Sequence, residues 1–208
     1  MAWAPVYAST AELRTFRQIE DTDDDTELAL AVEAASRSID RHCNRQFGIV
    51  ASAEARRYQA EYHNRYGRWV IPVDDFQTKT GLVIGLDPDE DLTFGTSIAT
   101  TEVDYWPPNA AEKGFPWTKL VMLPAATAFP DSVLGSVQVT ASWGWTAVPD
   151  TVKQATLLQA SRLVSRRLAQ FAIGGSFEVG DGVLPSTRLD GDVRVMLGKY
   201  RRNWGAVG

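Results

Sequence analysis

Acidic runs are the first feature of this chain whose residue types could support chemistry. Residues 21–25 read Asp-Thr-Asp-Asp-Asp, which is the kind of carboxylate spacing that calcium loops use. Such a loop also needs glycine at its sixth position and glutamate at its twelfth, and here these positions hold Thr26 and Val32. Residues 87–91 fail in the same way. We therefore expect two solvated acidic loops and no metal site.

Nucleophilic and phosphate-binding motifs are equally poorly supported. His42 and Cys43 are neighbours in the sequence, and adjacent residues on a helix do not face each other, so they cannot form a catalytic dyad. The glycine-rich stretch 174–182 lacks a following Gly-Lys-Ser/Thr, and Gly-x-Ser-x-Gly is absent from the chain. We expect no enzymatic activity and no cofactor.

Tryptophan and arginine leave two interpretations open. The tryptophans could form a sugar-binding platform, or they could be core and interface residues; we expect Trp143 in the core and Trp117 and Trp204 at interfaces. Some arginines could hold DNA phosphates, or they could form a solvated face or pair with an acidic neighbouring subunit. The tryptophans in question are Trp69, Trp106, Trp117, Trp143 and Trp145, and the arginines are Arg162, Arg166, Arg167, Arg201 and Arg202.

Two helices are predicted before residue 48. Ser9 and Glu12 have capping-box spacing and predict a short helix over 10–18 with Leu13 and Phe16 facing inward. A longer helix should follow a cap at Asp24 and end near residue 44. Its apolar stripe repeats at helical spacing, at Leu28, Val32, Ala35, Ile39 and His42 or Cys43.

Residues 48–148 should form an inserted β-rich block. Short β-prone runs alternate there with turn residues, and we interpret them as one small, mostly antiparallel sheet. The predicted strands cover 55–62, 68–73, 81–86, 101–106, 119–123 and 136–143. The last strand ends in a structural corner formed by Trp143, Gly144, Trp145 and Pro149, from which a helix should run to residue 173.

The C-terminal residues predict a helical arm on a flexible joint. Residues 174–184 contain four glycines. Beyond them an apolar stripe recurs at helical spacing, on a segment with two glycines that is too short to be a stable isolated helix. We therefore expect 174–208 to order against a portal or a neighbouring subunit. The expected partner-binding residues are Leu189, Val193, Arg194, Met196, Lys199, Tyr200, Arg201, Arg202 and Trp204.

Charge is distributed unevenly along this chain of 208 residues. The net charge is −5 and the pI is near 5.1, which disfavours a protein that coats nucleic acid. Residues 1–30 hold seven acids against two arginines, whereas residues 185–208 hold five bases against two acids. Ends of opposite sign suggest two different neighbours, or head-to-tail contact between copies. The single cysteine, together with the lack of a signal-peptide pattern or of an apolar run long enough to span a bilayer, predicts a cytosolic origin and no membrane contact.

Three stretches together resemble the head–tail connector (adaptor) proteins of long-tailed bacteriophages. They are the helix over 28–47 with its Cys-x-Arg-x-Phe ending, the strand and Trp-Gly-Trp-Thr-Ala-Val-Pro turn over 137–149, and the helix that follows. The resemblance implies a dodecameric ring in the virion neck, made in the bacterial host cytoplasm. It also implies contacts with a portal protein and a tail-side stopper protein, and a channel through which double-stranded DNA passes without sequence-specific binding.

The sequence therefore predicts an α+β fold with no catalytic role. A helical body comprises 1–47 and 149–173, a β-rich block comprises 48–148, and a joint and docking arm comprise 174–208. The alternative is a Trp-rich module that binds carbohydrate or peptide. Assembly distinguishes the two, because a connector forms rings or binds a portal, whereas a binding module is monomeric with ligand-quenched tryptophan fluorescence.

Overall fold

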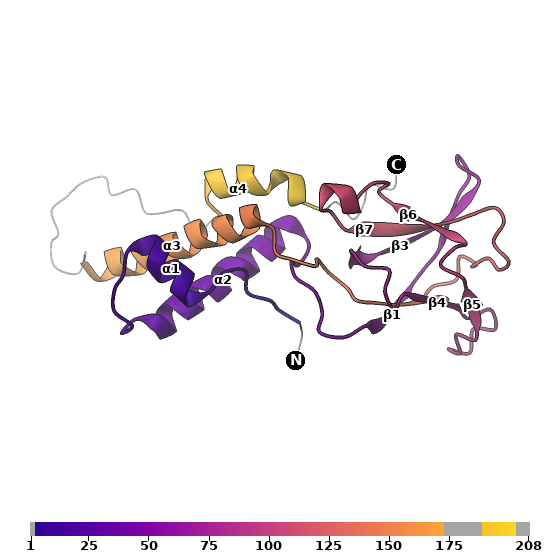
Figure 1. The fold of residues 1–208 in the computed structure, drawn as a ribbon, viewed down its shortest axis with the longest axis horizontal. Helices are drawn as coiled ribbons and strands as arrows, with labels where there is room; N and C mark the ends of the chain where they lie inside the picture. Colours follow the sequence, from indigo (N-terminus) through magenta and orange to yellow (C-terminus); the bar gives the residue numbers. More distant parts are fainter. Residues whose placement is uncertain (1–2, 173–188, 203–208) are drawn as a thin grey trace. The chain divides into compact units, whose positions relative to one another are not determined.

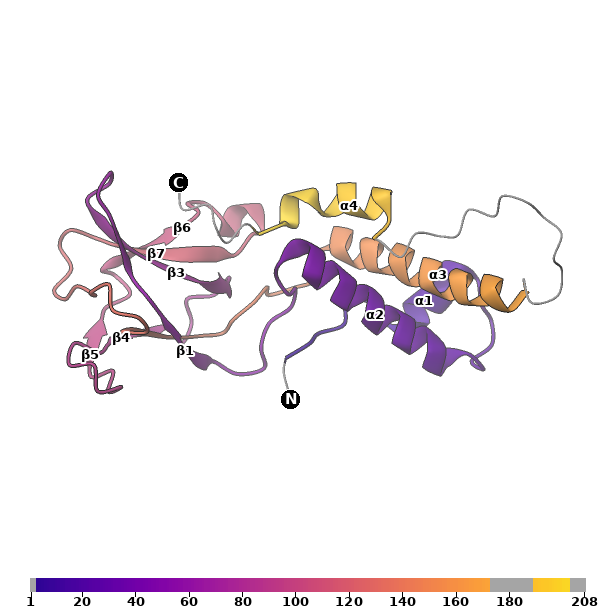
Figure 2. The same ribbon diagram turned by 180° about the vertical axis from the view of Figure 1, so that it is seen from behind.

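The computed structural model describes residues 3–172 and 189–202, without the side chains of 167–172. Within it the chain forms two compact units, each with its own contacts. The helical unit contains residues up to Phe47 and those from Val148 onward, and the β unit comprises Gly48–Ala147. Together they have the α+β composition that the sequence predicts. Figures 1 and 2 show the elements from opposite sides.

The first two helices begin and end close to their predicted positions. Helix α1 spans Thr10–Arg17, and Ser9 and Glu12 form the predicted capping box. Helix α2 spans Asp25–Cys43 and ends at Asn44, which adopts a left-handed conformation. Two details differ from prediction: the Asp24 side chain makes no capping hydrogen bond, and Phe16 is exposed. Leu13 is the one fully buried residue of α1, because a helix of eight residues has only about two turns that can contact the core.

The core of the helical unit lies between α1, α2 and α3. Helix α3 spans Asp150–Ala172, and the Pro149 carbonyl accepts its first hydrogen bonds from Val152 and Lys153. The predicted stripe of α2 is buried at every position when Cys43 rather than His42 is taken as its last member. Leu28, Val32 and Ala35 of α2 pack with Leu13, Ala8 and Ala160 in one cluster, and Leu157 and Val164 of α3 are packed against it.

The helical part of the predicted arm is already packed onto this unit. Helix α4 spans Gly191–Leu197 and continues into the 3-10 turn η3, Gly198–Tyr200. Its first residues are held against α3, because the Asp190 backbone N–H donates to Gln159 and its carboxylate pairs with Arg162. Its last residues are held against α2 by the Arg202 N–H, which donates to the Cys43 carbonyl (2.7 Å). Residues 190–202 thus have an intramolecular docking site that the sequence analysis did not foresee, while the glycine-rich joint lies outside the described residues.

The β unit contains two four-stranded antiparallel sheets rather than one. In the first, the strand order is β1 (Glu54–Tyr58), β8 (Val137–Ala141), β4 (Val83–Leu86) and β5 (Thr96–Ile98). In the second, it is β2 (Glu61–His63), β3 (Arg68–Phe76), β7 (Trp117–Met122) and β6 (Val103–Trp106). The predicted strand over 55–62 is split into β1 and β2, one in each sheet, and β5 was not predicted.

The Trp-Gly-Trp corner joins the two sheets. Trp143 follows β8 of the first sheet and forms an isolated bridge with Phe76 at the end of β3 in the second. Gly144 donates its backbone N–H to the Asp75 carbonyl at 2.5 Å, and the Trp145 indole donates to the Asp75 carboxylate at 3.1 Å. Both tryptophan side chains are 1% exposed, which confirms the prediction of a core role for Trp143. Trp143, Gly144 and Trp145 therefore form a structural feature of the β unit, whereas Pro149 belongs to the helical unit.

Replacing Gly144 should destabilise the β unit. Its φ of 105° is a conformation that side chains with a Cβ rarely adopt, so Gly144→Val adds backbone strain and displaces the flanking tryptophans. We expect a loss of about 2 kcal/mol or more in the free energy of unfolding, measured by denaturant titration. Gly95→Val is the matched control, because a Cβ at Gly95 meets no atom within 4 Å. Equal stability of the two variants would contradict the proposed role of the corner.

Candidate partner-binding surfaces

The predicted partner-binding residues of α4 separate into a buried and an exposed group. Val193 and Tyr200 are 0% and 5% exposed, because together with Leu197 they form the inner face of α4 and η3. Leu189 and Met196 are partly buried, and Arg202 is buried with its backbone bonded to α2. Arg194, Lys199 and Arg201 point to solvent, and Trp204 lies outside the described residues. The apolar stripe thus holds α4 on its own chain and leaves these basic side chains exposed.

Aromatic contacts hold the end of α4 in place. The Phe47 ring packs edge-on against Tyr200 at 5.7 Å between centroids and against Tyr7 at 5.6 Å. Such arrangements add to the stabilisation from burial alone. The three rings connect the N-terminal segment, the residue that ends the predicted Cys-x-Arg-x-Phe motif and the C-terminal turn. This fixes the backbone that carries Lys199 and Arg201.

Four exposed basic residues lie on the segments that meet at the C-terminal end of α2, and we call them the basic patch: Arg41, Arg194, Lys199 and Arg201. Arg41 is on the last turn of α2, and its guanidinium donates to the Arg37 carbonyl at 3.3 Å. Arg201 is adjacent to Arg202, which is bonded to Cys43. Burial and then the charges of Arg201 and Arg194 lower the pKa of His42 below 6.5. Their effect on one imidazole shows that these arginines lie near it.

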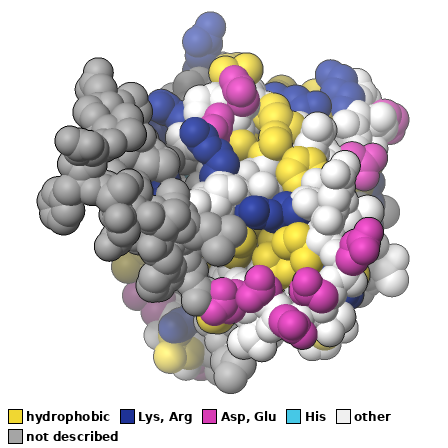
Figure 3. All heavy atoms as spheres, turned by 90° about the vertical axis from the view of Figure 1, so that its left-hand side faces the viewer, with side chains coloured by type: hydrophobic (Ala, Val, Ile, Leu, Met, Phe, Trp, Pro, Cys, Tyr) yellow, Lys and Arg dark blue, Asp and Glu magenta, His cyan; other side chains and the backbone are white. Residues whose placement is uncertain are grey.

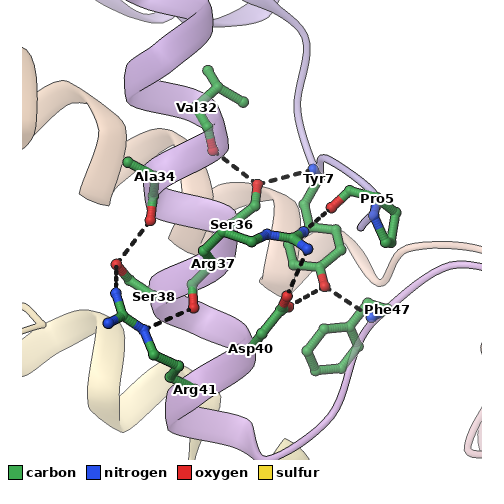
Figure 4. A network of polar contacts seen from close by, with 10 residues as sticks. All are labelled: Pro5, Tyr7, Val32, Ala34, Ser36, Arg37, Ser38, Asp40, Arg41 and Phe47. Carbon is green, nitrogen blue, oxygen red and sulfur yellow. Dashed lines mark hydrogen bonds and ion pairs between the residues drawn. The ribbon is translucent and has the colours of Figure 1, made fainter. Parts of the chain in front are cut away.

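A polar network fixes the N-terminal segment to α2 (Figure 4). The Tyr7 hydroxyl donates to Asp40 and accepts from the Phe47 backbone N–H at 3.0 Å. Arg37 pairs with Asp40 at 3.1 Å and also donates to the Pro5 carbonyl. Burial, followed by the hydrogen bond and charge of Asp40, raises the pKa of Tyr7, so the phenol stays protonated. The sequence did not indicate this network, because Tyr7 lies 33 positions from Asp40 and 40 positions from Phe47.

Acidic side chains gather at the other end of α2. The exposed acidic residues of the α1–α2 loop are Glu20, Asp21, Asp23 and Asp24, and we call them the acidic patch. Asp25, next to them, pairs with Arg14 at 3.1 Å. Figure 3 views the molecule from the side on which this loop lies in Figure 1, and acidic side chains gather along the lower part of that face. Among the described residues no group of three or more His, Cys, Asp or Glu side chains could hold a metal ion.

The tryptophans do not form a single platform. Trp143 and Trp145 are buried in the corner, and Trp117 is partly buried against Phe76 and Tyr105. Trp69 lines a pocket of about 320 Å³, in which the ring of Tyr62, 50% exposed, packs against the Trp69 ring with 5.3 Å between centroids. Phe129, Arg68 and Met122 line the same pocket, which the sequence analysis did not single out as a site.

The remaining residues that could have supported chemistry are buried or paired within the chain. Cys43 is fully buried, and this burial raises its pKa to about 12, so its thiol is protonated at neutral pH. Arg162 forms a salt bridge with Asp190. A salt bridge was one of the expected roles of these arginines, but here the partner belongs to the same chain and not to a neighbouring subunit. No helix in the described part of the chain is long and apolar enough to cross a membrane.

The fold is similar to that of a chain in a solved virus-like assembly. The assembly is the "neck of empty GTA particle computed with C6 symmetry", GTA being gene transfer agent; the TM-score is 0.52 at 16% identity, over 100% of this chain and 96% of that one. A chain from the "neck of native GTA particle computed with C12 symmetry" aligns with the same coverage and identity and a TM-score of 0.45. No protein-family model and no curated protein matches the sequence.

Loss of the Tyr7 hydroxyl should destabilise the helical unit. Tyr7→Phe leaves the buried Phe47 N–H without its acceptor and removes a hydrogen bond from Asp40. An unsatisfied buried polar group costs about 1–3 kcal/mol, which denaturant unfolding can measure. Tyr66→Phe is the control, because Tyr66 is 58% exposed and should change stability by less than about 0.5 kcal/mol. A Tyr7→Phe variant as stable as this control would show that the network contributes nothing.

The titration of His42 should report the basic patch. Because part of the lowering of its pKa comes from Arg201, the variant Arg201→Gln should raise that pKa towards 6.5, as followed by NMR. A histidine whose pKa is lower in the folded than in the unfolded state binds fewer protons when the protein is folded. Its contribution to the free energy of unfolding is therefore lost as the pH falls from 6.5 towards the pKa of the folded state. Arg57→Gln in the β unit is the control. An unchanged His42 pKa in Arg201→Gln would place Arg201 away from the patch.

Proposed function

We propose that this protein is a structural component of a phage or phage-like virion neck, where copies form a ring between the portal and the tail-side stopper. The observation that carries this proposal is the fold similarity to a neck chain, which covers 100% of this chain and 96% of that one. It agrees with the sequence resemblance to head–tail connectors, which rests on different information, namely the residues of α2, the Trp-Gly-Trp corner and α3. The proposed role is assembly and not catalysis.

The ring itself is supported by the symmetry of that similar structure. The neck of the empty GTA particle was computed with C6 symmetry. Six-fold symmetry is compatible with six copies or with twelve, and the sequence resemblance favours the dodecamer. Closed rings of identical subunits need a surface on each copy that is complementary to a different surface on the next. The exposed surface of the helical unit offers charges of both signs for this purpose.

The overall charge is suited to a DNA channel. A ring of twelve copies at −5 each presents a strongly negative surface, and DNA carries one negative charge per about 1.7 Å of its axis. Like charges disfavour tight binding, so the genome can move through the ring without being retained. On this proposal the protein lengthens the channel of the portal and offers the stopper a docking platform.

The pocket beside Trp69 supports the alternative function. Aromatic side chains around a pocket of about 320 Å³ are the type of site that binds a sugar or a short peptide. This alternative predicts a monomer whose tryptophan fluorescence changes when the ligand is added. It does not need any surface of the helical unit.

Electron microscopy of the purified protein, alone and mixed with its portal, tests the proposed function. We expect closed rings, either free or seated on the portal, and we expect heads that contain DNA but lack tails when the gene is deleted. The control is the portal alone. A protein that stays monomeric at all concentrations, does not bind the portal and shows fluorescence quenching by glycans would replace the neck role with the alternative.

A further inference from the structure

We propose that neighbouring copies in the ring bind head to tail through the acidic patch of one helical unit and the basic patch of the next. The inference rests on the proposed function, which it refines by naming the surface between subunits. Both patches belong to the same helical unit, so their separation is fixed by the structure of α2 and of the residues bonded to it.

The acidic patch concentrates negative charge that its own surroundings neutralise only in part. Glu20, Asp21, Asp23 and Asp24 are all exposed. The neighbouring Arg14 is engaged with Asp25, and Arg17 donates to the Ser161 carbonyl of α3 at 2.8 Å. The N-terminal end of α2 offsets part of the repulsion through the helix dipole. Like charges held this close still repel, and a cationic partner would relieve that repulsion.

The basic patch has the complementary composition. None of Arg41, Arg194, Lys199 and Arg201 has an ion pair among the described residues. Two acids on the same segments are already engaged, Asp40 by Tyr7 and Arg37 and Asp190 by Arg162, while Asp192 on α4 is exposed. The basic patch therefore has four basic side chains and the acidic patch has four acids. When the basic patch of one copy meets the acidic patch of the next, these charges can balance.

The length of α2 prevents the two patches of one copy from pairing with each other. Its 19 residues span about 27 Å at 1.5 Å per residue. Exposed charges are screened beyond about 8 Å at physiological ionic strength, so each patch acts independently of the other. Two different surfaces at opposite ends of a rigid body make a heterologous contact, and such contacts repeat around a closed ring.

Each patch also has an exposed aliphatic side chain in its vicinity. Val195, on α4 between Arg194 and Lys199, is 82% exposed, and Leu30, in the second turn of α2, is 62% exposed. Apolar contact surrounded by charged residues is typical of the surfaces where subunits meet. DNA offers no apolar group of this kind on its phosphate backbone, so a second copy of this chain fits the basic patch better.

Charge reversal with mixing tests the inference. One double variant carries Glu20→Lys and Asp23→Lys, and the other carries Arg194→Glu and Arg201→Glu. Each variant alone should reduce the fraction of protein in rings roughly tenfold or more, because the reversal cancels the net charge of one patch and makes its two reversed side chains face like charges at every contact. An equimolar mixture should restore rings of alternating composition, since the reversed side chains of one variant then face the reversed side chains of the other as opposite charges, and the remaining contact of each copy joins two unchanged patches. Sedimentation velocity and native mass spectrometry, with the portal added if the wild type needs it, give the ring fraction.

Matched variants in the β unit control for net charge. Asp89→Lys with Glu112→Lys, and Arg57→Glu with Arg65→Glu, change the net charge by the same amounts at exposed positions. These controls should assemble as the wild type does, and thermal unfolding should show all variants folded. Increasing salt should lower the ring fraction of the wild type.

Three outcomes would overturn the inference while leaving the proposed function in place. Rings that persist in both variants, or a mixture that stays unassembled although both variants are folded, would exclude the pairing of the two patches. An Arg194→Glu, Arg201→Glu variant that forms rings but loses binding to a DNA duplex would assign the basic patch to DNA. Failure of the wild type to form rings, alone or with the portal, would overturn the proposed function itself.

Discussion

The helical unit depends on the burial of one stripe along α2. Leu28, Val32, Ala35, Ile39 and Cys43 lie on one face of this helix and are all buried. No single neighbouring helix covers that stripe. Helices α1 and α3 pack on its N-terminal half, and the last turn of α2 receives the C-terminal segment through the Cys43 carbonyl. The positions of α1, α3 and α4 therefore follow from the need to cover α2.

A second consequence is that α4 can be short. An isolated helix of seven residues is not stable in water, and two glycines weaken this segment further. Contacts at both ends of the segment compensate for its low helix propensity. They are the salt bridge between Arg162 and Asp190 at its start and the backbone hydrogen bond of Arg202 at its end. Val193 and Leu197 fill the space between. This explains how a weak helix can still present Arg194 and Arg201 in fixed places.

The elements that could be predicted are those encoded by local periodicity. The stripe of α2, the capping box of α1 and the strand before Trp143 all repeat or cap within a few residues, and the structure confirms them. β5 escaped prediction because Thr96–Ile98 contains one apolar residue and has no alternation to detect.

The surfaces were harder to predict, because they depend on residues far apart in sequence. The stripe of α4 was recognised, but the sequence does not show whether its partner is another protein or α2 and α3 of the same chain. Arg41 joins the basic patch from 153 positions before Arg194, and nothing local marks it. Tyr7 likewise bonds Asp40 across 33 positions. Only the packing of the helices brings these residues together.

The two patches give the net charge of −5 a structural interpretation. In an isolated subunit, exposed bases on α4 would attract DNA and oppose its passage through a channel. Contacts between copies would consume these bases together with an equal number of acids, and the remaining surface of the ring would keep the full net negative charge of its subunits. Assembly and channel charge would then have one origin. The same arginines that join neighbouring copies would be removed from the surface that the genome meets.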